Sequence, residues 1–139
     1  IEPHAAARAL PYIDATRLAE LRQMDSLIDE AQERGDLEQV SLLNQNFHRA
    51  LYTANPHQVT LPLIESLWLQ LGPFMRLATS KLDEHYLVDR HKELTDAIEK
   101  KDALALQLAL TADIRDGIAF AGTPELLHRF IEQSASGGR

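Results

Sequence analysis

Apolar residues recur along this chain at intervals of three and four positions, which is the spacing of one face of an amphipathic helix. Glycine and proline fall mainly between these periodic segments, and no Asn-Gly pair joins two alternating apolar runs as it would in a β-hairpin. Short connections between helices favour antiparallel neighbours. The pattern therefore predicts an all-α fold, an antiparallel bundle of six to seven helices around one core.

Local signals mark where most of these helices begin and end. Pro11 discourages continuation of the first helix, and Gly35 is suited to end the second. Asp36 can cap the third helix, which Asn55-Pro56 breaks. We expect helices over residues 1–10, 14–34, 37–54, from about 59 onward, 83–100 and 103–120, and a short last helix that starts at Thr123-Pro124.

The fourth predicted helix is apolar on most of its sides, because large apolar residues fill most positions between 63 and 75. A helix of that kind is normally buried, so we expect it to be the most central helix of the bundle. Gly72-Pro73 within it predicts a kink.

Four polar residues on three predicted helices fall within apolar stripes, where helical phase directs them toward the core. Asn44 and His48 are four positions apart, so they stack on one face of the third helix. His91 lies in the stripe of the fifth helix, and Asp113 lies in that of the sixth. A buried carboxylate is costly unless it is paired, hydrogen-bonded or bound to a cation, and no inward lysine is evident to pair with Asp113.

Each of these residues alone is most simply explained as a hydrogen-bonded core residue. Together they favour a metal or ligand site, because a small helical core avoids several inward polar groups unless they satisfy one another.

The sequence gives weaker support for a catalytic site. The sequence has no His-Glu-x-x-His, no glycine-rich phosphate loop and no Gly-x-Ser-x-Gly, and neither His48 nor His91 follows a glutamate at the spacing of a di-iron bundle.

Charge and composition narrow the choice of partners. Fourteen Lys and Arg against 21 Asp and Glu give a net charge of -7, the wrong sign for a surface that neutralises DNA phosphates. The chain has no cysteine, so a metal would need His, Asp, Glu, Asn or water as ligands, and a cytoplasmic location is expected. No apolar run approaches the roughly 20 residues of a membrane span, so no membrane partner is expected.

Three segments resemble one known family in sequence and in order. Residues 1–9, IEPHAAARA, resemble the Leu-Glu-Pro-x-Ala-Ala start of the FCD domain. Residues 44–56, NQNFHRALYTANP, resemble its Asp-x-x-Phe-His-x-x-Leu helix and the turn after it, and residues 91–102 resemble its His-x-x-Ile/Leu segment with a downstream Ala-Ile and Asp. The chain is thus similar over nearly its whole length to the FCD domain, the C-terminal half of one large subfamily of GntR-type bacterial transcription regulators.

The resemblance implies a divalent metal held by an Asp and a His on one helix and by two later His residues, beside a pocket for small organic acids. These positions fall on Asn44, His48, His91 and Asp113, so an amide replaces the usual Asp and a carboxylate replaces the last His. The formal ligand charge is unchanged. Loss of one imidazole should weaken the preference for zinc or nickel relative to harder, oxygen-loving ions.

Two arginines are candidate ligand-binding residues, because a guanidinium binds a carboxylate through two parallel hydrogen bonds. Arg8 lies within the stripe of Ile1, Ala5 and Tyr12, which would direct it inward. Arg76 follows the predicted kink, on the helix expected to form the floor of the pocket. The alternative for both is a surface arginine whose aliphatic stem covers apolar surface.

The favoured hypothesis is an effector-sensing domain over residues 1–139, forming a homodimer and binding a small carboxylate beside the metal. It contacts DNA only through an N-terminal winged-helix domain that is absent from this chain, which opens on Ile1 without an initiating Met. A structural dimerisation bundle with a closed polar network and no ligand is the second hypothesis. A metal-dependent enzyme is the third, placed last because base and nucleophile motifs are missing.

Overall fold

The all-helical prediction is confirmed by a computed structural model, which describes residues 1–79, 90–121, 128 and 132. Within these ranges every regular element is a helix, and no strand is formed. The elements are α1 (Glu2–Ala9), the short 3-10 helix η1 (Leu10–Tyr12), α2 (Ala15–Glu33), α3 (Leu37–Thr53), α4 (Leu61–Thr79), α5 (His91–Glu99) and α6 (Ala103–Ala121).

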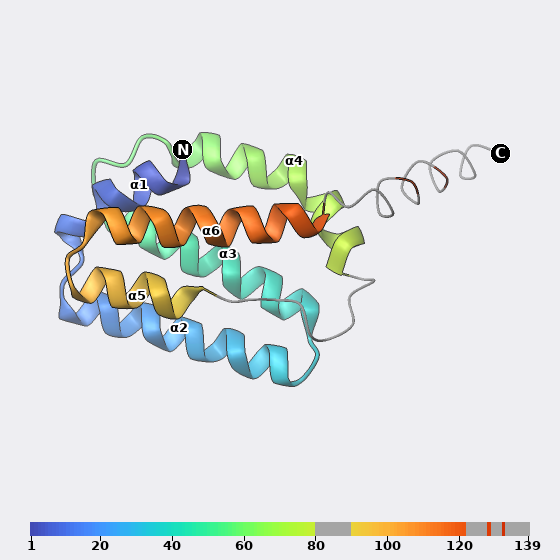
Figure 1. Ribbon diagram of the computed structural model, residues 1–139, viewed down its shortest axis with the longest axis horizontal. Helices are drawn as coiled ribbons and strands as arrows, with labels where there is room; N and C mark the ends of the chain where they lie inside the picture. Colours follow the sequence, from blue (N-terminus) through green and yellow to red (C-terminus); the bar gives the residue numbers. More distant parts are fainter. Residues whose placement is uncertain (80–89, 122–127, 129–131, 133–139) are drawn as a thin grey trace.

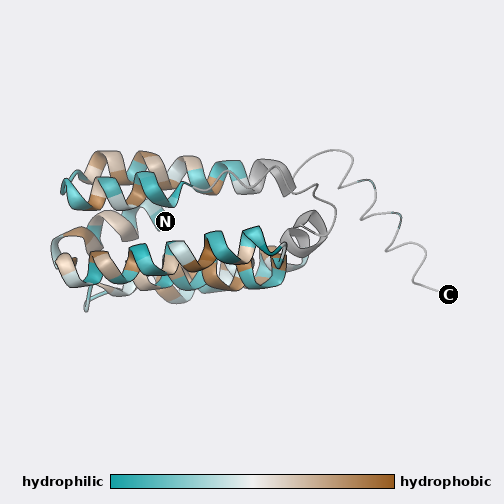
Figure 2. Cartoon of the chain, turned by 90° about the horizontal axis from the view of Figure 1, so that it is seen from below, coloured by the Kyte–Doolittle hydropathy of each residue, from teal (hydrophilic) through white to brown (hydrophobic). Residues whose placement is uncertain are grey.

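The helices form a bundle around α6, which runs across the middle of Figure 1 with α1 and α4 on one side and α5 and α2 on the other. Helices α2 and α3 run antiparallel, as do α5 and α6 (Figure 1). Figure 2 shows hydrophobic and hydrophilic positions interleaved along the helices, as amphipathic elements require. The largest fully buried apolar side chains come from α2 to α6 and from the segment between η1 and α2, and they include Ile13, Leu21, Phe47, Leu51, Ile64, Leu94 and Leu110.

The predicted boundaries of α2 and α3 are confirmed. Asp14 caps α2 by accepting a hydrogen bond from the Arg17 backbone N–H at 2.8 Å, and Asp36 caps α3 through the N–H of Gln39 at 3.1 Å. Gly35, between these helices, has a φ of 70°, the left-handed conformation that glycine adopts without steric cost. Helix α5 begins at His91 with Arg90 as its N-cap, so the prediction of one helix running from 83 to 100 is wrong at Arg90. Residues 83–89, and the short helix expected from 123, lie outside the described residues.

The expectation that the fourth helix is the most central is wrong. Among the described residues, the main packing partners of α4 are α6 and α3, so the apolar surface of α4 is only partly covered. Ile64 is fully buried, whereas Leu63, Leu67 and Leu71 are 59%, 43% and 37% exposed. The hydropathy of a helix sets how much apolar surface it could bury, whereas the number of neighbouring helices decides how much of that surface is buried. None of the helices in the described part of the chain is long and apolar enough to cross a membrane.

The orientation of α6 gives a direct test of the core. Leu110 is fully buried, so Leu110→Ala should lower the free energy of unfolding by about 2–5 kcal/mol through lost burial and the cavity left behind. Leu108 lies on the same helix but is 62% exposed, so Leu108→Ala should change it by no more than about 0.5 kcal/mol. Urea denaturation measures both, and equal losses would contradict this orientation of α6.

Candidate metal centre

Three of the four predicted inward polar residues lie together between α3, α5 and α6. His48, His91 and Asp113 each offer one ligand atom, and these atoms all lie within 4.8 Å of one another. Nε2 of His48 is 3.3 Å from Oδ2 of Asp113, and the two imidazole ring centres are 5.3 Å apart. Both histidines are buried, and 14% of the Asp113 side chain is exposed. Two imidazoles and one carboxylate that converge in this way can hold a divalent cation and leave coordination positions open.

Arg8 does not point into the core, so its predicted inward orientation is wrong. Helix α1 turns its alanine face to the bundle, burying Ala5, Ala6 and Ala9. These small side chains allow close approach of the helices, and Arg8 lies off that face and is exposed. Ile1 and Tyr12, which were expected to share an inward apolar stripe with Arg8, are also 58% and 47% exposed. The alanine face is therefore the buried side of α1, and the predicted stripe is not.

The remaining predicted site residues are Asn44 and Arg76. Asn44 is half-buried on α3, one helical turn before His48 and on the same side of the helix. Arg76 belongs to α4, but its side chain lies outside the described residues.

A chain of hydrogen bonds fixes the orientation of the His48 ring. Nδ1 of His48 lies 3.3 Å from the Tyr52 hydroxyl, which donates to Oε2 of Glu2 at 2.7 Å. The second oxygen of Glu2 accepts from the Trp68 indole N–H at 3.2 Å. Burial raises the pKa of Tyr52, and the negative charge of Glu2 raises it further, so the hydroxyl remains a donor. Since its one proton goes to Glu2, it accepts from Nδ1–H of His48, and Nε2 faces Asp113.

The His91 ring is held from two sides. Its Nδ1 lies 3.1 Å from Oδ1 of Asp25 on α2, and its face stacks on Phe47 with ring centres 4.1 Å apart. A carboxylate that accepts the Nδ1–H of an imidazole fixes the tautomer in which Nε2 carries the free electron pair. This arrangement is common around histidines that bind metals, so the surroundings of His91 fit a metal ligand.

His48 is the protein partner of Asp113 that the sequence did not reveal. Their contact is an ion pair when the imidazole carries a proton on both nitrogens. A cation bound in the same place would replace the proton on Nε2 of His48, because imidazole coordinates through an unprotonated nitrogen. The cluster can therefore satisfy its own charges or exchange a proton for a metal ion.

The supporting residues Asp25 and Tyr52 were missed by the sequence analysis, although their spacing contains the signal. Asp25 lies four positions after the buried Leu21 and three before the buried Ile28, so it shares their face of α2. Tyr52 lies one turn beyond His48 on α3. The same argument from helical phase that identified Asp113 applies to both.

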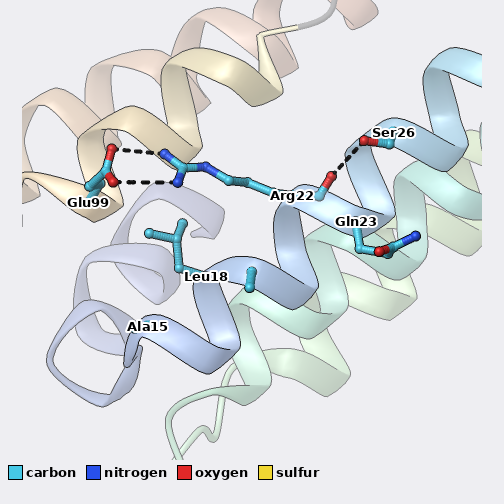
Figure 3. A pocket seen from close by; sticks show the side chains of 7 residues that line it. Ala15, Leu18, Arg22, Gln23, Ser26 and Glu99 are labelled. Carbon is cyan, nitrogen blue, oxygen red and sulfur yellow. Dashed lines mark hydrogen bonds and ion pairs between the residues drawn. The ribbon is translucent and has the colours of Figure 1, made fainter.

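A separate cavity of about 430 Å³ lies between α2 and α5 (Figure 3). Arg22 crosses it and contacts both carboxylate oxygens of Glu99, at 3.4 and 2.9 Å. The other lining residues are Ala15, Leu18, Ala19, Gln23 and Ser26. No residue of the His48–His91–Asp113 cluster lines this cavity, so it is not the space around the candidate metal centre.

Comparison with known proteins agrees with the resemblance. The family model described as the FCD domain matches residues 1–116. The chain is 28% identical over 124 residues to the HTH-type transcriptional regulator McbR of Escherichia coli strain K12, covering 86% of this chain and 55% of that protein. The solved structure of E. coli McbR/YncC superposes with a TM-score of 0.80 at 27% identity, covering 86% of this chain and 61% of that one.

The chain thus spans little more than half the length of these relatives. The relative is named a transcriptional regulator, in agreement with the prediction that the protein is not an enzyme. Since the family model covers well over half of the sequence, this chain belongs to the FCD domain family.

Proposed function

We propose that this chain is the effector-sensing domain of a GntR-type transcription regulator, which binds a divalent metal ion in its core and a small carboxylate at the open positions of that metal. The observation that carries the proposal is the convergence of His48, His91 and Asp113 from three helices. Asn44, one turn before His48, is the proposed fourth ligand. Zinc, nickel and harder ions all suit two imidazoles with oxygen ligands, so the chemistry of the donor set leaves the identity of the metal open.

The proposed output is altered placement of DNA-binding domains. Residues 1–139 form one ligand-binding and dimerisation domain in this proposal, and DNA is contacted by an N-terminal winged-helix domain outside this chain. The net charge of -7, and the fact that the E. coli relative is an HTH-type regulator, support this division between sensing and DNA binding. The effector acts by binding one arrangement of the dimer better than another.

One observation favours the structural dimerisation bundle as a second candidate. The polar core residues already contact one another, through His48–Asp113 and His91–Asp25, so they can be satisfied without an ion. Metal analysis by mass spectrometry of protein purified without a histidine tag separates the two candidates. About one metal ion per chain supports the sensing domain, whereas metal-free protein that takes up no added zinc, nickel or manganese supports the structural bundle.

Asp113 provides the sharpest test of the metal ligands. Asp113→Ala should abolish metal binding in isothermal titration calorimetry, because it removes the charged ligand. Asp113→His should retain binding and shift preference toward zinc or nickel, since a softer ligand is introduced. Glu30→Ala on the exposed face of α2 is the control and should bind as the parent does. If Asp113→Ala binds metal normally yet loses several kcal/mol of metal-free stability, the scale for a broken buried pair, Asp113 is a structural partner of His48.

Asp25 is predicted to set metal affinity without touching the metal. Asp25→Asn weakens the hydrogen bond that orients His91, so zinc affinity should fall by roughly tenfold to hundredfold, the range for supporting partners of metal ligands. Glu30→Gln, on the same helix, should leave affinity unchanged. An Asp25→Asn variant with parental zinc affinity would contradict the role of His91 as a ligand held by Asp25.

The proposed homodimer is assigned to the exposed apolar flank of α4, where Leu63, Leu67 and Leu71 follow one another at intervals of four residues. Contiguous exposed apolar surface of this kind marks an interaction site. Light scattering should show a dimer for the parent chain at about tens of micromolar and a monomer for Leu63→Glu combined with Leu67→Glu. Leu108→Glu, at an exposed position of α6, should remain dimeric. A monomeric parent, or a dimeric double variant, would contradict the assignment.

A further inference from the structure

We propose that Arg90 binds the second carboxylate of a short dicarboxylate effector, and that Asp116 occupies this place on Arg90 when no effector is bound. The inference deepens the proposed function and rests on it, because it requires an acid whose first carboxylate reaches the metal. It replaces Arg8, which is exposed, as the anchor for the acid.

Arg90 is the N-cap residue of α5 and directly precedes His91. Asp116 follows Asp113 by three residues on α6, so the two carboxylates lie on neighbouring positions of one helix side. Three residues correspond to a rise of about 4.5 Å along the helix axis. The same two helices that contribute His91 and Asp113 therefore also carry Arg90 and its partner Asp116, and Asp116 lies about one turn beyond Asp113 on α6. From this placement we infer that a short diacid can span from the metal to Arg90.

Nε and one terminal nitrogen of Arg90 each lie 2.8 Å from the same oxygen of Asp116. This edge of the guanidinium, with two parallel N–H groups, is the edge that binds a carboxylate in bidentate fashion. The other terminal nitrogen lies 3.2 Å from Glu93, so Arg90 is held in place while that edge changes partner.

The side chains of Arg90 and Asp116 are 27% and 36% exposed, so the pair lies at the rim of the bundle and not in the dry core. An effector carboxylate can replace Asp116 there without leaving a buried charge, because the released carboxylate is solvated by water. A fully buried pair would resist such an exchange.

Arg22 provides a matched comparison. It too bridges two helices and contacts two carboxylates, Glu99 at 2.9 Å and Asp96 at 3.8 Å. Arg22 belongs to the separate cavity in Figure 3, and neither it nor its partners is next to a residue of the candidate metal centre in the sequence. Removing the Arg22–Glu99 pair therefore shows what the loss of an ion pair between two helices does to binding when the pair lies away from the candidate metal centre.

The experiment measures binding of small acids to the zinc-loaded chain by calorimetry at fixed ionic strength. The probes are malonate, succinate and glutarate, each paired with the monocarboxylate of equal length, propionate, butyrate and valerate. The parent should bind its best diacid at least about tenfold more tightly than the matching monoacid, the effect of a charge-assisted hydrogen-bonded pair. Arg90→Gln should remove this preference while leaving zinc and monoacid affinities unchanged, and Arg90→Lys should retain part of it.

Asp116→Asn separates competition from a purely structural role, because the two predict opposite changes in diacid affinity. If Asp116 competes with the effector, its replacement should strengthen diacid binding, opposite to Arg90→Gln. If the pair only clamps α5 to α6, both variants should weaken diacid and zinc binding together, and the inference is overturned. Arg22→Gln and Glu99→Gln should change neither affinity, and a loss of diacid preference in either would likewise overturn it.

Different results would contradict the role of Arg90 and the proposed function of the domain. Monoacids and diacids bound equally well, with no effect of Arg90→Gln, would remove the role of Arg90 and leave metal-dependent effector sensing intact. Binding of zinc without binding of any of the six acids would count against the proposed effector class itself, and this inference would fall with it.

Discussion

The contact between His48 and Asp113 is the constraint on which the polar core depends. It joins α3 to α6 inside a shell of apolar side chains, where an uncompensated carboxylate would be strongly destabilising. The requirement for a polar partner extends to two further helices. Asp25 on α2 contacts His91, and the Tyr52 hydroxyl donates to Glu2 on α1. With Trp68 of α4, which donates to Glu2, six helices are therefore tied to one cluster by hydrogen-bonding groups that must be satisfied together.

That requirement gives the cluster two ways to be stable. With a proton on Nε2, His48 pairs with Asp113 and the core closes on itself. In the proposed metal-bound state the same side chains would be ligands, and Asp25 and Tyr52 would keep the two imidazoles in the tautomer that coordination needs. A core of this kind is suited to sensing, because binding changes the charge at the point where several helices meet without requiring a new set of contacts.

The rim of the bundle adds selectivity to this arrangement. The chain carries a net charge of -7, so an anionic effector is repelled unless cationic groups lie near its binding site. A bound divalent ion is one such group. Arg90, which already contacts the Asp116 carboxylate of α6, is the second such group in our proposal, and its place relative to the metal ligands would discriminate between acids of different length.

The sequence by itself determined the helices, most of their ends and the inward direction of His48, His91 and Asp113. Helical phase and capping are local properties, fixed by spacings of a few residues. Only the tertiary structure decided that α4 lies at the edge, that Arg8 is exposed, and that Asp113 meets His48. These features depend on which helix faces which and how much of each is covered. The spacing of residues within one helix carries no information about its neighbours, and for that reason the partners of the polar core could not be read from the sequence.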